Sequence, residues 1–273
     1  MINTKAIQQT LKTEFGYRSP EPGRLLKKLP GWAATAFYYT RLLSLIYSSS
    51  KVAKKRHYSL EKWAADSHEI IGFVEAVGGR HHISGMKEMA RHPGPVVFIA
   101  NHMSMLDTFL LPGLIVPFHR ATFVVKKSLL HYPVFGAIMA AVRPISLERK
   151  NPRKDLRVVI EEGQRLLRNG CSVIIFPQST RSARFDAANF NSLGVKLAKQ
   201  AGTFVVPLAL KTDFQANGRF IKEMGAVHPK KTVHIKFGRP LPVTGNGQAT
   251  HQAVIRFIEE NLLKWGGEIQ SDG

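Results

Sequence analysis

The sequence predicts an α/β fold: a mixed, largely buried sheet flanked by helices, preceded by a helical segment at the N-terminus. Roughly the first quarter of the chain has apolar residues at helical spacing, and after it apolar runs of strand length alternate with helical stretches. With 273 residues and 44% hydrophobic composition, the chain is long enough to bury a full core. We therefore expect an N-terminal helical region over residues 1–79 and an α/β domain over residues 80–273.

The first element to consider is the stretch PGWAATAFYYTRLLSLIYSSS, residues 30–50. It is apolar and aromatic, but Arg41 interrupts it, and its apolar part is short against the roughly 20 residues of a membrane-spanning helix. Three lysines and an arginine follow between residues 51 and 56, where they can meet anionic headgroups. The pattern favours an interfacial membrane anchor over about residues 30–56, and an ordinary helix packed on the domain is the alternative.

The remaining helices and strands follow from caps and apolar runs. Ser59 is a good N-cap for a second helix, and Asn151 with Pro152 begins another that Gly170 ends. A last amphipathic helix is predicted in HQAVIRFIEENLLKW. The predicted strands are VVFIA (96–100), ATFVV (121–125), SVIIF (172–176), FVVPLAL (204–210) and VHIKF (233–237). Alternation of such strands with helices is typical of an α/β domain.

The chain is strongly basic. Lys and Arg outnumber Asp and Glu by 39 to 19, a net charge of +20, which attracts nucleic acid, anionic lipid or a phosphorylated substrate. A basic cluster over residues 149–157 could follow a phosphate backbone, but no helix-turn-helix, zinc-finger or aromatic RNA-binding signature accompanies it. Nucleic acid is therefore the less favoured partner.

Cysteine and histidine usage argues against a disulfide framework and against a metal site. The single Cys171 begins a run typical of a buried strand and fits a reducing compartment. The 11 histidines include no HExxH motif, and the adjacent His81 and His82 would point to opposite sides of a strand. We expect no metal and no bound cofactor.

The stretch NHMSMLD, residues 101–107, places a histidine and an aspartate five positions apart after an apolar run. Within one helix, residues five apart differ by about 140° around the axis, so the two side chains would diverge. At a strand-to-helix turn they can converge, and Asp107 would then accept one imidazole N–H and leave the other nitrogen of His102 as a general base. The alternative is a helix-capping aspartate beside a solvent-facing histidine.

Four ordered blocks resemble the glycerolipid acyltransferase family, which includes the lysophosphatidic acid acyltransferases. NHMSMLD is similar to the first family motif, NHxSxxD, and KKSLLHYPVFGAIMAAVRPISLER resembles the second block. FPQSTRS (176–182) is similar to the third motif, FPEGTRS, and VVPLAL (205–210) resembles the fourth. The resemblance runs from about residue 83 to residue 241.

The resemblance implies a mechanism and a set of site residues. By it, His102 deprotonates the acceptor hydroxyl, Asp107 orients His102, and the alkoxide attacks a thioester directly without an acyl-enzyme. The absence of a GxSxG elbow agrees with such a mechanism. The expected substrate-binding residues, which include the phosphate-binding cations of the family, are Ser104, Lys126, Arg149, Gln178, Ser179, Thr180 and Arg181.

The resemblance also implies the reaction: transfer of a fatty acyl group from acyl-CoA or acyl carrier protein to a lysolipid. The leading acceptor is 1-acylglycerol 3-phosphate, giving phosphatidic acid in phospholipid synthesis. Gln178-Ser179 stands where the family has Glu-Gly, which removes a negative charge near the expected headgroup. Alternative acceptors are therefore glycerol 3-phosphate, another lysophospholipid or a lyso-aminolipid.

A different class of function also stays open, namely a non-catalytic basic protein that binds lipid or nucleic acid. For the enzyme, the expected partner is an anionic membrane surface. The expected location is the cytoplasmic face of the cell membrane, where the chain would be a peripheral or monotopic protein.

Overall fold

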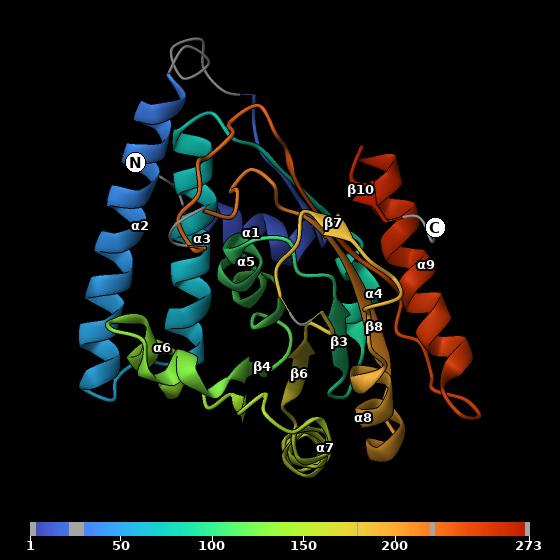
Figure 1. The fold of residues 1–273 in the computed structure, drawn as a ribbon. Helices are drawn as coiled ribbons and strands as arrows, with labels where there is room; N and C mark the ends of the chain where they lie inside the picture. Colours follow the sequence, from blue (N-terminus) through green and yellow to red (C-terminus); the bar gives the residue numbers. More distant parts are fainter. Residues whose placement is uncertain (1–3, 22–29, 179, 219–221, 271–273) are drawn as a thin grey trace.

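The apolar runs of the sequence form the centre of a mixed sheet in the computed structural model, which describes residues 4–21, 30–178, 180–218 and 222–270 (Figure 1). Over these residues the strand order is β1-β2-β9-β8-β3-β6-β4-β5. The strands are β1 (Tyr17–Arg18), β2 (His81–Ser84), β3 (Val97–Ala100), β4 (Ala121–Lys126), β5 (Ile145–Leu147), β6 (Ser172–Ile175), β8 (Val205–Lys211) and β9 (Val233–Phe237). The five predicted strands are confirmed as β3, β4, β6, β8 and β9.

The pairing of the strands makes the sheet largely parallel. From β8 through β3, β6 and β4 to β5, all neighbours are parallel, and β2 is parallel to β9. The pairs β1–β2 and β8–β9 are antiparallel. Two short strands, β7 (Arg184–Phe185) and β10 (Glu268–Ile269), pair in parallel beside this sheet. The predicted mixed, largely buried sheet is confirmed.

Helices cover both faces of the sheet (Figure 1). The apolar core on one face contains residues from α1 (Thr4–Glu14), α2 (Gly31–Lys54), α3 (Leu60–Ala76), α4 (Met86–Arg91), α5 (Met105–Ile115) and α6 (Phe135–Ala141). The core on the opposite face contains residues from α7 (Pro152–Arg168), α8 (Leu193–Ala201) and α9 (Gln248–Lys264). A 3-10 helix, η2 (Lys127–His131), joins β4 to the turn before α6.

The predicted N-caps form as expected. The side chain of Ser59 accepts a hydrogen bond from the Lys62 backbone N–H, and that of Asn151 accepts from the amides of Arg153 and Lys154. These caps satisfy amide groups that have no partner within the helix. They account for the sharp starts of α3 and α7.

The N-terminal helices share their core with the sheet. Leu11, Tyr38 and Ile71, from α1, α2 and α3, lie in the same apolar cluster as the sheet residue Phe98. The other side of α2 exposes large apolar side chains, of which Trp32 is 77% exposed. Along the described residues, no helix has the length and apolarity needed to cross a bilayer. The division at residue 79 stays a prediction.

Candidate active site

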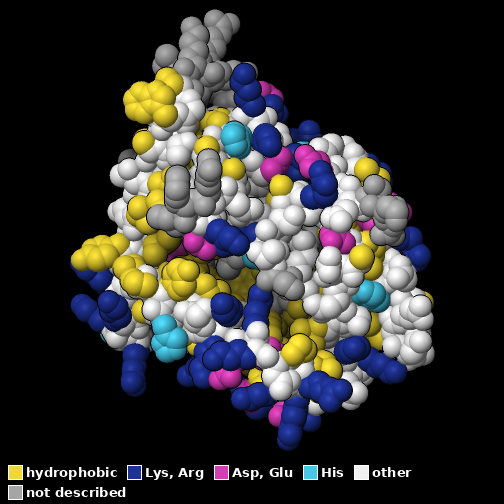
Figure 2. All heavy atoms as spheres, viewed as in Figure 1, with side chains coloured by type: hydrophobic (Ala, Val, Ile, Leu, Met, Phe, Trp, Pro, Cys, Tyr) yellow, Lys and Arg dark blue, Asp and Glu magenta, His cyan; other side chains and the backbone are white. Residues whose placement is uncertain are grey.

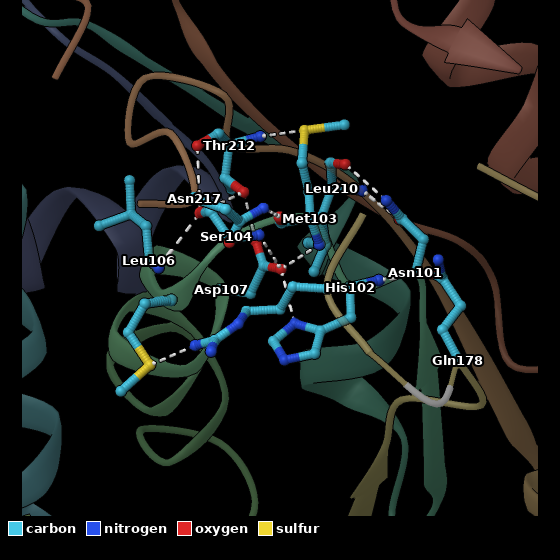
Figure 3. Close-up of polar contacts among 12 residues, drawn as sticks. Asn101, His102, Met103, Ser104, Leu106, Asp107, Gln178, Leu210, Thr212 and Asn217 are labelled. Atoms are coloured by element: carbon cyan, nitrogen blue, oxygen red, sulfur yellow. Dashed lines mark hydrogen bonds and ion pairs between the residues drawn. The ribbon is translucent and has the colours of Figure 1, made fainter. Parts of the chain in front are cut away.

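His102 and Asp107 meet where β3 turns into α5 (Figure 3). The strand ends at Ala100, Ser104 caps the helix, and Asp107 is its third residue. Imidazole Nδ1 of His102 lies 2.9 Å from Oδ2 of Asp107. Because an ionised carboxylate only accepts hydrogen bonds, Nδ1 donates in this contact, and in the neutral imidazole the lone pair is then on Nε2. The turn thus leaves Nε2 of His102 available as a base.

Asp107 caps the helix and holds the histidine at the same time. It is fully buried, and its Oδ2 atom accepts the backbone N–H groups of Met103, at 2.6 Å, and Ser104, at 3.1 Å. The second of these belongs to a capping box with Ser104. The two interpretations of the HxxxxD spacing are therefore compatible, since the capping bonds fix the carboxylate that orients His102.

Thr212, directly after β8, completes this network (Figure 3). Its hydroxyl donates to Oδ1 of Asp107, and Oγ of Ser104 lies 2.9 Å from Oγ1 of Thr212. Ser104 is therefore buried at the helix N-cap and does not line the neighbouring cavity. Asn217 adds a hydrogen bond of 3.0 Å to the Met103 carbonyl.

The ring of His102 stacks on Phe176, the first residue of FPQSTRS. The ring centroids lie 4.1 Å apart with an angle of 14° between the planes, and Phe176 stacks in turn on Phe123 at 5.8 Å. A flat aromatic surface restricts rotation of the imidazole. The ring orientation is therefore fixed both by Asp107 and by this stack.

Gln178 holds the backbone of the same histidine. Its Oε1 atom accepts the His102 N–H at 2.7 Å, and the side chain is buried. This contact needs only an acceptor oxygen, which an amide supplies as well as a carboxylate does. The departure from the family glutamate thus keeps a hydrogen-bond acceptor at this position while removing its charge. Ser179, the other departure, lies outside the described residues.

A cavity of about 450 Å³ opens beside His102. It brings together expected site residues from three separate sequence blocks. Those that line it are His102, Lys126, Arg149, Gln178, Thr180 and Arg181. The backbone of Arg149 has a φ of +54°, a left-handed conformation that costs a non-glycine residue energy and recurs at functional sites.

Among the cations that line this cavity, Arg181 is the least exposed to solvent, and it forms an ion pair. Its Nη2 atom donates to Oε1 of Glu223 at 2.6 Å, and its Nη1 atom lies 3.1 Å from the sulfur of Met105. The side chains of Arg181 and Glu223 are 16% and 26% exposed. Lys127, next to Lys126, instead pairs with Glu148 on the surface.

Sequence reasoning missed three residues of this site. Thr212 follows the fourth family block by two positions, and Phe176 begins the third, so both had a positional signal. Glu223 had none, because it lies in an irregular segment with no motif. Each of the three contacts a predicted residue directly.

Cys171 lies outside the cavity lining and in the core, as predicted. Burial raises the pKa of its thiol, so the thiol stays protonated at neutral pH. A protonated, buried thiol is a poor nucleophile. This placement agrees with direct transfer rather than with an acyl-enzyme on cysteine.

Comparison with known proteins places this geometry in a family. Residues 82–211 match the model of the family described as Acyltransferase. A 1-acyl-sn-glycerol-3-phosphate acyltransferase of Pseudomonas aeruginosa is 26% identical over 241 residues, which cover 88% of this chain and 87% of that protein. A chloroplast protein of the same name from Arabidopsis thaliana is 29% identical over 157 residues, 58% of this chain and 41% of that protein.

The fold has a solved counterpart. The crystal structure of PlsC, a 1-acyl-sn-glycerophosphate acyltransferase from Thermotoga maritima, matches with a TM-score of 0.69 at 17% identity, covering 88% of this chain and 98% of that one. The strand-to-helix turn, the four ordered blocks and the sequence matches agree with one another. Residues 82–211 thus belong to the Acyltransferase family, and the sequence matches support an O-acyltransferase of the glycerolipid type.

Proposed function

We propose that the chain transfers a fatty acyl group from a thioester to the free hydroxyl of 1-acylglycerol 3-phosphate, giving phosphatidic acid. The observation that carries this proposal is that His102, whose free Nε2 can act as a base, lines the same cavity as Lys126, Arg149 and Arg181. The acceptor carries a hydroxyl and a phosphate, so it needs a base and cations in one cavity. The names of the relatives support this acceptor.

The dyad would act on the proton of the acceptor. Nε2 of His102 takes the hydroxyl proton as the oxygen attacks the thioester carbonyl, and Asp107 stabilises the imidazolium that forms. The tetrahedral intermediate then collapses, the carbon–sulfur bond breaks, and the imidazolium returns the proton to the leaving thiolate. General-base catalysis of this kind contributes a factor of about 10²–10⁴ in rate.

The cations would hold the phosphate of the acceptor. Arg181 presents a planar guanidinium that can donate two parallel hydrogen bonds to phosphate oxygens, and Lys126 and Arg149 add charge. Thr180 adds a hydroxyl at the same cavity. Ser179, whose structure is not described, stays a predicted member of this set.

A second, apolar cavity of about 450 Å³ adjoins the first and would take an acyl chain. The two cavities share Met105, Leu129, Tyr132, Phe135 and Glu223. The second cavity lies against α2, and it is lined mainly by apolar and aromatic side chains. Such a lining suits hydrocarbon and leaves the polar headgroup at the cations.

The surface around the apolar cavity supports attachment to a membrane. Figure 2 shows hydrophobic side chains gathered over α2 and α6, with Lys and Arg side chains beside them. The exposed apolar residues on this side are Trp32, Phe37, Leu43, Tyr47, Tyr132, Val134 and Met224. Apolar side chains flanked by cations suit the interface of an anionic membrane. We place α2 at that interface.

The donor would be an acyl-CoA or an acyl carrier protein thioester. A third cavity, of about 620 Å³, extends toward α7 and α8 and shares Val124, Arg149, Phe176 and Gln178 with the first. Direct transfer needs both substrates at His102 together, and this third cavity gives the donor a separate approach. The two donors share a phosphopantetheine arm, so the cavity does not distinguish between them.

The proposal is tested by acyl transfer from radiolabelled acyl-CoA and acyl carrier protein to a panel of lysolipids and glycerol 3-phosphate. We expect phosphatidic acid from 1-acylglycerol 3-phosphate, and loss of that product in His102→Ala. Transfer to a different acceptor alone would overturn the assigned substrate. No product from any pair, with folded protein and a working positive control, would overturn the function.

A further inference from the structure

The cation end of the first cavity already contains an anion. Among the described residues that line this cavity, Glu223 is the only acidic one, and it is bonded to Arg181 at 2.6 Å. Both side chains are largely withdrawn from solvent. An ion pair shielded in this way is stronger than one on the open surface. Arg181 is therefore not an empty phosphate site, because a carboxylate occupies part of its fork.

The backbone that carries Glu223 is fixed to α2. The side-chain amide of Gln215 donates to the Glu223 carbonyl at 3.0 Å and to the Tyr39 hydroxyl at 3.1 Å. The Tyr39 hydroxyl donates in turn to the Gly225 carbonyl at 2.7 Å. Gln215 and Tyr39 are both buried. These buried hydrogen bonds position Glu223 next to Arg181, so the ion pair is more than a chance contact between surface side chains.

Close packing around Gly225 reinforces this support. A Cβ atom at this glycine would lie 2.1 Å from the Ala216 carbonyl oxygen, so no other residue fits without a shift of the backbone. The Ala216 N–H also donates to the Ala226 carbonyl at 3.0 Å. With its backbone fixed, the carboxylate of Glu223 can leave Arg181 by rotation of its own side chain alone.

A phosphate and the Glu223 carboxylate compete for the same donors. Two anions in contact at one guanidinium repel each other, so the stronger binder displaces the weaker. A phosphate monoester carries up to two negative charges and three oxygens, against one charge and two oxygens for a carboxylate. The acceptor phosphate therefore displaces the Glu223 carboxylate, but its net affinity is reduced by the free energy needed to break the Arg181–Glu223 pair.

We propose that Glu223 is a displaceable counter-ion of Arg181. Glu223 sets the affinity of the site for phosphate, and α2 holds its backbone in place. This inference rests on the proposed function, because it takes the headgroup site from it. The phosphatidic acid product keeps the same phosphate as the acceptor. The returning carboxylate then competes with the product for Arg181 and favours its release.

The test uses the full chain in detergent and a phosphate monoester that cannot be acylated, dodecyl phosphate. In Glu223→Gln we expect its affinity, measured by calorimetry, to rise about fivefold, the factor that corresponds to about 1 kcal/mol. The same variant should show a lower KM for 1-acylglycerol 3-phosphate and stronger inhibition by phosphatidic acid. In an Arg181→Ala background the gain in affinity should vanish.

Two further variants complete the test, one as a control and one to probe the support of Glu223. Glu162→Gln breaks an Arg–Glu pair of similar geometry on the exposed surface of α7, at Arg165, and should leave dodecyl phosphate binding unchanged. Tyr39→Phe removes the hydroxyl link to Gly225 and should give a smaller gain of the same sign as Glu223→Gln.

Unchanged or weaker binding by folded Glu223→Gln, in a protein whose wild type transfers to 1-acylglycerol 3-phosphate, would overturn the counter-ion role and leave the function intact. Glu223 would then serve only to hold Arg181 in place. A wild type that neither binds dodecyl phosphate nor uses the phosphate acceptor would overturn both proposals.

Discussion

The two ends of the first cavity hold their charged side chains in different ways. At one end, Asp107 is fully buried and accepts hydrogen bonds from two backbone amides, a threonine hydroxyl and His102. At the other end, Arg181 has one carboxylate partner, and Arg149 is exposed. A carboxylate with every oxygen satisfied keeps one position, whereas a cation with a replaceable partner can exchange it for a ligand.

This difference matches the two tasks that we propose for the cavity. A general base must keep its geometry through the reaction, because small displacements of reacting groups lower the rate strongly. A headgroup site must bind and release, so its contacts have to be exchangeable. The dyad end should therefore control kcat, and the cation end should control KM for the acceptor. Three variants test this division, and a fourth tests direct transfer without a cysteine intermediate; they follow from the largest expected effect to the smallest.

The largest effect is expected for His102→Ala. Loss of the base should lower kcat by about 10²–10⁴. Steady-state transfer assays measure it, and thermal unfolding checks that the protein is folded. His57→Ala, at an exposed histidine beyond α2, is the matched control. If His102→Ala retained most of the wild-type kcat, the assignment of His102 as the general base would be contradicted.

Arg181→Ala should come next, with its effect on the acceptor. Loss of charge-assisted hydrogen bonds, about 2 kcal/mol in total, should raise KM for 1-acylglycerol 3-phosphate about thirtyfold and leave KM for the donor unchanged. Arg184→Ala, at an exposed arginine that pairs with Glu268, should change neither. A fall in kcat alone, at unchanged KM, would argue that Arg181 acts in the chemistry.

Thr212→Val should have a smaller effect, of a kind that tests positioning. It removes the hydroxyl that donates to Oδ1 of Asp107 and should lower kcat about fivefold, for about 1 kcal/mol, without a change in KM. Thr212→Ser restores the hydroxyl and should recover the rate. NMR of the His102 Nδ1 proton should show a shift in the valine variant, which a purely structural role of Thr212 would not require.

The smallest effect is expected for Cys171→Ser, which should keep wild-type kcat. Burial raises the pKa of the Cys171 thiol above its ordinary value, so the reactive thiolate appears only as the pH rises beyond that value. A thiol reagent should therefore leave the native protein unmodified at neutral pH and react after denaturation. Rapid modification of native protein at pH 7, with loss of activity, would instead support an acyl-enzyme intermediate on Cys171.

The dyad could be predicted from the sequence because its partners are local. His102 and Asp107 lie within one seven-residue motif, and a strand-to-helix turn is enough to bring them together. Thr212 is 105 residues from Asp107, and Glu223 is 42 residues from Arg181. Contacts over such separations depend on how the elements pack. Neither periodicity nor a motif reports that packing.

The same distinction holds for the fold. Strands β3, β4, β6, β8 and β9 were predictable because the centre of the sheet is buried on both faces and reads as continuous apolar runs. The strands β1 and β5 have two and three residues, too few to show a pattern. The sequence also left two alternatives for α2, a helix at a membrane interface and a helix packed on the domain. The exposed and buried sides of this helix became distinct only once the sheet was in place.

The most direct test of the division of labour is a comparison of His102→Ala and Arg181→Ala in one assay, with initial rates measured across a full range of 1-acylglycerol 3-phosphate concentrations. We predict that His102→Ala loses kcat at nearly unchanged KM, whereas Arg181→Ala reaches nearly the wild-type kcat at a much higher acceptor concentration. Equal losses of kcat in both variants, with KM unchanged, would contradict the assignment of chemistry to one end of the cavity and recognition to the other.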